Sequence, residues 1–190
     1  MLVYNAFSAV RDGTFDQFKN YYSGNVDETD KFEGLNLLCM AMTNDDNPEE
    51  KLKIVHFLLQ AGIDVNFVTK SEHRNALHYF YNCVWRPNPK FAMEITKLLV
   101  ENGIDVNSVD KYGHVPLFYA VFDNDLDTKE NEELYFYLLK AGSDYRLRDP
   151  FGKSIIDYAR ETNERTGFLD IVKEYENGKK WLQVEKWQRL

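Results

Sequence analysis

Apolar residues recur along this chain with helical spacing, in short segments that end at a glycine. The clearest segment covers residues 51–66, KLKIVHFLLQAGIDVN, and related segments follow twice further along the chain. Gly62, Gly103 and Gly142 set the register of the three copies, with separations of 41 and 39 residues. A constant period of about 20–50 residues is typical of proteins that stack repeated structural units. The pattern therefore predicts an all-α chain of helix pairs packed in a row.

The apolar faces divide the chain into about five units of two helices each. The first unit is predicted as two short helices between residues 4 and 22, which form a cap because an end unit needs a polar outer side. The segment after Gly62, residues 63–66, is expected to be short and extended. Residues 179–190 predict a separate helix, which either covers the last unit or binds a partner. We expect a repeat domain over residues 1–178, with units near residues 2–29, 30–66, 67–107, 108–145 and 146–177.

Turns and helix ends follow a pattern in which Asp-x-x-Gly forms a turn, and Pro-Leu-His with a later Ala forms a first helix. The matches are Asp110, Gly113, Pro116, Leu117 and Ala120, Leu77 and His78, Leu38 and Ala41, and Asp149, Gly152, Ile156 and Ala159. The second helices end in Leu58, Leu59, Gly62, Asp64, Val65 and Asn66, in Leu99, Gly103, Asp105, Val106 and Asn107, and in Leu138, Leu139, Gly142 and Asp144. On these residues the chain resembles ankyrin-repeat proteins over nearly its whole length. The resemblance implies an all-α solenoid of about five helix-turn-helix repeats, whose leucine pairs bury against neighbouring repeats.

The chain departs from the ankyrin pattern in its period, because the family period is about 33 residues. The additional residues lie between the two helices of a unit, so we expect lengthened inter-helix loops at the edge opposite the β-turn fingers. His73 replaces a turn glycine, which leaves the geometry of the third finger open. Two of the loops are acidic, with Asp45, Asp46, Glu49 and Glu50 in one and Asp123, Asp125, Asp127, Glu130, Glu132 and Glu133 in the other, and the third contains Trp85, Arg86, Pro87 and Pro89.

Composition and charge narrow the classes of protein that fit. The formal net charge is −8 at pH 7, which argues against nucleic acid as a general partner and fits a basic protein partner better. No apolar run approaches the about 20 residues of a membrane span, and the N-terminal residues lack the features of a secretion signal. Two cysteines, Cys39 and Cys83, are too few for a disulfide framework, so we expect a reducing compartment, the cytoplasm.

Motifs for catalysis and metal binding are missing from the sequence. It holds no nucleotide-binding glycine motif, no P-loop and no His-Glu-x-x-His motif. His78 takes the turn-bonding histidine position that the ankyrin resemblance implies, and its spacing to His73 and Cys83 matches no standard set of zinc ligands. The alternating acids of residues 123–127 suggest calcium, but the glycine and final glutamate of a hand-type loop are missing. We expect no enzyme activity, no cofactor and no metal site.

The candidate partner-binding residues lie at positions that vary in the ankyrin family, on finger tips and on the exposed side of the first helices. Aromatic side chains beside charges are typical of interface anchors. Burial between neighbouring repeats is the alternative for Tyr81 and Phe122. The acidic loop is expected to steer a basic partner toward the protein. The residues expected to bind a partner are Phe32, Glu72, Arg74, Trp85, Lys111, Tyr112, His114, Phe122, Asp123, Asp125 and Asp127.

Together these features predict a non-catalytic protein-binding module that acts as a monomer. The small acidic chain looks like the stand-alone bacterial ankyrin proteins that serve as immunity factors and sequester a toxin, often a basic nuclease. That resemblance implies a chain that neutralises a basic protein partner. Two further functions fit the same pattern. One is a cytoplasmic adaptor that joins other proteins, and the other is a structural subunit that self-associates through its C-terminal tail.

Overall fold

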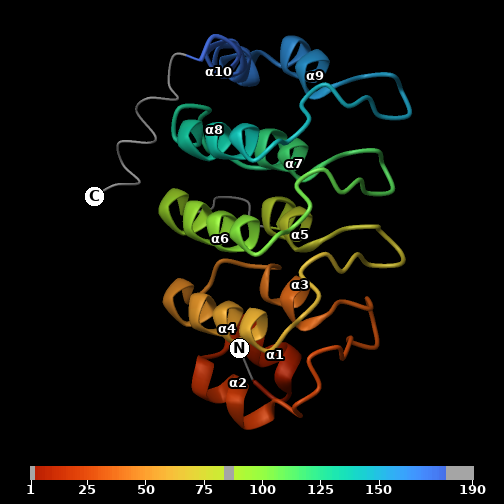
Figure 1. Ribbon diagram of the computed structural model, residues 1–190, viewed down its shortest axis with the longest axis vertical. Helices are drawn as coiled ribbons and strands as arrows, with labels where there is room; N and C mark the ends of the chain where they lie inside the picture. The colour runs from red at the N-terminus through yellow and green to blue at the C-terminus, as the bar shows by residue number, and fades with distance from the viewer. Residues whose placement is uncertain (1–2, 84–87, 179–190) are drawn as a thin grey trace.

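The computed structural model describes residues 3–83 and 88–178, so the predicted tail helix at residues 179–190 lies outside the described part. Figure 1 shows helix pairs stacked in a row, with finger-like turns that project from one side. The prediction of an all-α repeat solenoid is confirmed. The helices are α1 (Ala6–Asp12), α2 (Phe15–Tyr21), α3 (Leu37–Ala41), α4 (Pro48–Gln60), α5 (Ala76–Cys83), α6 (Pro89–Glu101), α7 (Pro116–Phe122), α8 (Glu132–Lys140), α9 (Ile155–Glu161), the 3₁₀ turn η1 (Asn163–Arg165) and α10 (Gly167–Glu176).

The helices form two columns that share one hydrophobic core. The first helices α3, α5, α7 and α9 lie on the side of the fingers, and the second helices α4, α6, α8 and α10 form the column behind them (Figure 1). Each unit buries its apolar stripe against the next, so the core runs from the first unit to the last. Leu58, Leu99 and Leu138 are fully buried and Leu59 is half-buried. The prediction that these leucines point into a shared interior is confirmed.

Asparagine side chains join the end of each unit to the next unit. Nδ2 of Asn66 donates to the Gly103 carbonyl at 2.9 Å, and its Oδ1 accepts the Asp105 amide at 2.6 Å. Asn107 makes the same two bonds to the following unit, at 2.9 and 2.7 Å. The prediction of an extended segment before Asn66 is wrong, because the Asp64 carboxylate accepts the Asn66 amide at 2.9 Å and closes a turn. These turns hold successive units in register.

The third finger keeps its turn without a glycine. His73 has a φ of +55°, in the left-handed region where a residue with a Cβ pays roughly 1–2 kcal/mol. Its amide donates to the Thr69 carbonyl at 2.9 Å, whereas in the fourth finger the Gly113 amide donates to Asp110, one residue nearer in sequence. The third finger is therefore the same kind of turn with one additional residue, and the histidine occupies the position of the glycine.

Neighbouring fingers touch at Gly113, and we expect alanine there to lower the free energy of unfolding by about 2 kcal/mol. Gly113 has a φ of +85°, and a Cβ at this position would lie 2.5 Å from Cδ of Pro150. Gly103 has nearly the same φ, +86°, but no atom of the described residues lies within 4 Å of its Cβ position, so Gly103→Ala should cost only about 1 kcal/mol. Urea denaturation of both variants measures the difference. If both variants lose the same free energy of unfolding, the fourth and fifth fingers can move apart without loss of stability.

Buried polar groups order the lengthened loop between α7 and α8. Nδ2 of Asn124 donates to the Ala120 carbonyl at 2.6 Å, and Nδ2 of Asn131 donates to Oδ1 of Asn124 at 3.1 Å. Arg165, from the last unit, donates to the carbonyl of the buried Leu126 at 2.6 Å. Because its backbone is held from inside, the loop presents its acidic side chains on a fixed frame.

Candidate protein-binding surface

Four tight turns form what we call the finger row, at residues 30–35, 69–74, 110–114 and 149–153. An aspartate holds three of these turns from within. The Asp110 carboxylate accepts the amides of Tyr112 and His114 at 2.9 and 3.0 Å. Asp30 and Asp149 accept the amides of their own turns in the same way. The backbone at the finger tips is therefore fixed before any partner arrives.

Aromatic side chains stand on three of the four finger tips. Phe32 is 98% exposed, Tyr112 50% and Phe151 85%. Aromatic anchors on a fixed backbone are common at interfaces, because few side-chain torsions remain to be frozen on binding. Phe32 and Tyr112 are among the predicted residues, and the sequence interpretation missed Phe151. The signal was present, because each of the three aromatics follows its finger aspartate by two positions.

Tyrosines on the first helices hold the base of each finger, and the sequence interpretation missed them as well. Their hydroxyls reach the residue that opens the finger, 9 or 10 positions earlier in the chain, and they recur at the repeat period. The Asp149 carboxylate raises the pKa of Tyr158 to about 12, so this hydroxyl stays a donor at neutral pH. The bonded pairs are Tyr79 with Thr69 at 3.1 Å, Tyr119 with Asp110, and Tyr158 with Asp149 at 2.5 Å.

Arg74 lies beneath the finger row, where its side chain is only 12% exposed. Its guanidinium lies 3.3 Å from Oδ2 of Asp110 and donates to Oδ1 of Asn82 at 2.7 Å and to the Tyr119 hydroxyl at 2.8 Å. Burial raises the pKa of Asp110, but hydrogen bonds from Tyr119 and the turn amides outweigh it and hold the pKa below its usual value. Arg74 is thus placed to join the third finger to the fourth, with little surface left for a partner.

Lys111 and Glu72 form a second bridge between the same fingers, at the surface. Their side chains pair at 2.6 Å, and the Lys111 amide donates to the Glu72 carbonyl at 2.9 Å. The Lys111 ammonium also lies 4.9 Å from the centre of the Tyr112 ring. The structure therefore brings these three predicted residues together on one exposed patch.

Tyr81 and Phe122, for which the sequence left binding or burial open, both pack inward. Tyr81 is buried and its hydroxyl lies 2.6 Å from Oγ1 of Thr96. Phe122 is half-buried, with its ring centre 4.9 Å from that of Phe118. Tyr81 is therefore a core residue, and Phe122 is only partly open to a partner.

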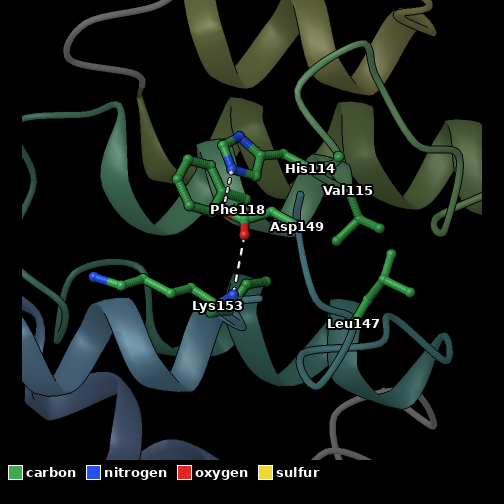
Figure 2. Close-up of a pocket in the computed structure, with 8 residues that line it drawn as sticks. His114, Val115, Phe118, Leu147, Asp149 and Lys153 are labelled. Carbon is green, nitrogen blue, oxygen red and sulfur yellow. Dashed lines mark hydrogen bonds and ion pairs between the residues drawn. The ribbon is translucent and has the colours of Figure 1, made fainter. Parts of the chain in front are cut away.

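A small pocket opens between the fourth and fifth fingers, with His114 on its wall (Figure 2). The His114 imidazole stacks on Phe118, with ring centres 3.6 Å apart and planes 12° apart. Its Nε2 lies 3.5 Å from Oδ2 of Asp149, too far for a good hydrogen bond. Val115 and Leu147 face each other on the other side of the pocket (Figure 2). His114 is thus a pocket wall rather than a projecting contact.

The negative charge of the chain is concentrated in residues 43–50 and 123–133, which we call the acidic edge. These two segments consist of an inter-helix loop and the first turn of the helix that follows it, α4 or α8. Residues 43–50 carry four carboxylates and no cation, and residues 123–133 carry six carboxylates and one lysine. The formal charge of the two segments together is −9, and that of the whole chain is −8. Each first helix begins beside a finger and ends at its inter-helix loop. The acidic edge therefore lies at the far ends of these helices from the finger row.

The predicted residues of this edge differ in their surroundings. Asp123 is half-buried and accepts a hydrogen bond from Nδ2 of Asn82 at 2.6 Å. Asp125 and Asp127 are exposed. Trp85, in the loop between α5 and α6, lies outside the described residues. Only part of the predicted acidic set is therefore open to a partner.

The titratable interior has a structural role. His78 is fully buried, its Nε2 lies 3.1 Å from the His114 carbonyl, and burial lowers its pKa to about 4, which keeps the ring neutral near pH 7. Cys39 is buried, Cys83 is exposed, and both are free thiols.

Across residues 3–83 and 88–178, no group of three or more His, Cys, Asp or Glu side chains is placed to hold a metal ion. In the same residues, no helix is long and apolar enough to cross a membrane.

Comparison with known proteins agrees with this architecture. A family model described as ankyrin repeats, in three copies, matches residues 48–149, which is more than half of the chain. No curated protein matches the chain. Ankyrin repeats are protein–protein interaction modules and are typically non-catalytic. The helix pairs, the finger row and the family match together show that the chain belongs to the ankyrin-repeat family.

Proposed function

We propose that this protein binds a basic protein partner in the cytoplasm and neutralises it by sequestration, as immunity factors do with a toxin. The observation that carries the proposal is the set of exposed aromatic tips on fingers whose backbone is fixed. Phe32 and Phe151 are almost fully exposed, and Tyr112 is half-exposed with the Lys111 ammonium 4.9 Å from its ring centre, so the three side chains present apolar area to a partner. Such anchors dominate binding energy at protein interfaces, because they leave water completely on binding.

The acidic edge supports a partner of positive charge. Carboxylates concentrated in two ordered loops produce a local field that raises the rate of encounter with a positive protein. The association rate should therefore fall as salt is added, since the Debye length shortens from about 10 Å at 0.1 M to about 3 Å at 1 M.

Tyr112→Ala is expected to weaken binding to the partner at least 10-fold, because a half-exposed aromatic anchor on a fixed turn is lost. The partner to use is the product of the neighbouring gene, co-expressed with this chain and purified as a complex. Calorimetry measures the Kd, and relief of growth inhibition on co-expression tests sequestration. Tyr21→Ala removes an exposed tyrosine from α2 and should leave the Kd unchanged. Wild-type affinity in the Tyr112 variant would remove the finger row from the interface.

An adaptor that joins two proteins is the second candidate, and the separation of two surfaces favours it. The finger row is aromatic and the acidic edge is charged, and they lie at opposite ends of the first helices. If substitutions in each surface abolish binding of a different protein, the adaptor role holds. A structural subunit that assembles through residues 179–190 remains a third proposal, which the concentration dependence of molecular mass tests directly.

A further inference from the structure

A row of hydrogen-bonded side chains leads from the fourth finger to the acidic edge. It begins at the Asp110 carboxylate, whose Oδ2 lies 3.3 Å from Nε of Arg74. Arg74 donates from Nη1 to Oδ1 of Asn82 at 2.7 Å. Asn82, near the end of α5, donates in turn from Nδ2 to Oδ2 of Asp123 at 2.6 Å. The row therefore connects the turn that carries Tyr112 with a carboxylate of the acidic edge.

The two ends of this row belong to the two surfaces that are proposed to bind a partner. At the finger, Asp110 accepts the Tyr112 amide at 2.9 Å, and the Arg74 guanidinium lies 5.9 Å from the centre of the Tyr112 ring. At the other end, Asp123 directly follows α7 and is half-buried, so part of it is open to a cation. The helix α7 between the two ends is about 10 Å long, and groups this far apart act independently unless something joins them.

Asn82 is the residue that joins them, because its amide group is bonded on both sides. An amide oxygen only accepts and an amide NH₂ group only donates, so Arg74 and Asp123 together fix the orientation of this side chain. An ammonium group of a partner that reaches Asp123 competes with Nδ2 of Asn82 for the carboxylate. The amide therefore has two arrangements, bonded to Asp123 or released from it, and only the first gives Arg74 a fixed acceptor at Asn82.

The fifth unit provides an internal comparison. Lys153 and Glu161 are eight positions apart, as are Arg74 and Asn82, and they also form a bridge along a first helix, at 2.6 Å. Glu161 is exposed, and no hydrogen bond or ion pair within residues 3–83 and 88–178 extends this bridge to the acidic edge. A change at Asp123 should therefore reach the fourth finger and leave the fifth finger unaffected.

We propose that Asn82 couples the two binding surfaces, so that a cation bound at Asp123 changes the surroundings of Tyr112 on the fourth finger. Asn82 is a positioning residue in this coupling, because it acts through Asp123 and Arg74. The inference rests on the proposed protein-binding function and adds regulation to it, since a basic ligand at the acidic edge alters the affinity of the finger row. Coupling between two sites is reciprocal, so a ligand at the fingers also alters the affinity of the acidic edge for cations.

The test is to titrate the whole protein with an oligolysine peptide at low salt and to follow the titration by ¹H–¹⁵N NMR. The peptide is drawn to the acidic edge by charge, and low salt keeps this attraction strong. We expect the Tyr112 amide and the Nε–H group of Arg74 to shift as the peptide saturates the protein. The Phe151 amide, which donates to Asp149 in the same geometry, should not shift.

Asn82→Leu nearly keeps the size of the side chain and removes both of its hydrogen bonds. In this variant the Tyr112 amide should no longer respond to the peptide. The peptide should nevertheless bind about 2- to 10-fold more tightly, because no hydrogen bond to Asp123 has to be broken first. Asp127→Asn is the matched control, since it removes one charge from an exposed aspartate of the same loop. It should weaken peptide binding and leave the shift of the Tyr112 amide at saturation unchanged.

A Tyr112 amide that does not respond in the wild-type protein, or that responds equally in the Asn82→Leu variant, would overturn the coupling. Asp123→Asn should abolish the response too, and it decides the question if the Asn82 variant does not fold. If the acidic edge itself shows no shifts, Asp123 does not bind cations and the inference is wrong.

The proposed function is judged separately, by the affinity of the Tyr112→Ala variant for the co-expressed partner. A loss of that affinity, together with a Tyr112 amide that does not respond to the peptide, would leave protein binding standing and remove only the coupling.

Discussion

Replacing Asp110 with alanine is expected to lower the free energy of unfolding by about 3–5 kcal/mol. The Asp110 side chain is fully buried and accepts the Tyr112 and His114 amides, the Tyr119 hydroxyl and the Arg74 guanidinium. Without the carboxylate, a mostly buried cation and two turn amides lose their acceptor at once, and a buried charge without its partner is among the most costly defects in a protein. Chemical denaturation followed by circular dichroism measures the loss.

Asp149→Ala is the matched control for this prediction. Asp149 accepts the amides of the fifth finger in the same geometry, but in the described part of the chain no arginine pairs with it, so we expect a smaller loss of about 1–3 kcal/mol. Asp27→Ala, at an exposed turn, should change stability by less than about 0.5 kcal/mol. If Asp110 and Asp149 cost the same, Arg74 contributes nothing to joining the fingers.

Lowering the pH should reduce the difference in the free energy of unfolding between the wild-type protein and the Asp110→Ala variant. The folded pKa of Asp110 is lowered, so its contribution is present above the unfolded value near 3.9 and is lost as pH falls through the folded value. The free energies of unfolding of the two proteins should therefore approach each other as the pH falls below the unfolded value, while they stay far apart at pH 7.

The fold could be predicted because its determinants lie close together in sequence. A helix that ends in two leucines and a left-handed glycine forms its C-terminal turn from residues adjacent in sequence. Its apolar face must also be covered by a neighbouring unit, and this holds for any sequence that the neighbouring unit has. Gly62, Gly103 and Gly142 therefore gave the register directly. The aromatic residues at the finger tips could also be predicted from the sequence, because Phe32 and Tyr112 follow a turn aspartate by a fixed number of positions. Phe151 has the same spacing, and it was missed only because that pattern was not applied to it.

The polar interior could not be predicted, because its partners meet only in the folded chain. Arg74 reads as a surface residue in sequence, yet it bonds to Asp110 and Tyr119, 36 and 45 positions away. Lys51 shows the same limit. A pattern of apolar and polar positions places this lysine at the surface of α4, yet Lys51 is 2% exposed. A binary pattern of apolar and polar residues assigns lysine to solvent. Here backbone carbonyls take the place of water as hydrogen-bond acceptors for the ammonium.

Lys51→Met is expected to lower the free energy of unfolding by about 2–3 kcal/mol at pH 7. The Lys51 ammonium donates to the carbonyls of Arg11 and Ala41 at 2.9 and 2.7 Å and to Oδ1 of Asn44 at 2.5 Å. It therefore joins the capping unit to both helices of the second unit. Methionine fills the same space but leaves these acceptors without a donor, and the relief of burying a charge offsets only part of that loss. Lys53→Met, an exposed lysine paired with Glu50, should cost less than about 1 kcal/mol.

The pH dependence of this difference is a sharper test than its size at neutral pH. Burial lowers the pKa of Lys51 from 10.5 to about 8, so between these values the unfolded chain binds more protons than the folded one. The free energy of unfolding of the wild-type protein should therefore rise with pH in this window, and that of the Lys51→Met variant should not show this rise. Because one pKa unit corresponds to about 1.36 kcal/mol, the gap should widen by about 2 kcal/mol from pH 7 to pH 9.5. Urea denaturation at both pH values decides it, and a gap that stays constant or narrows would mean that the three acceptors hold the ammonium more strongly than burial opposes it.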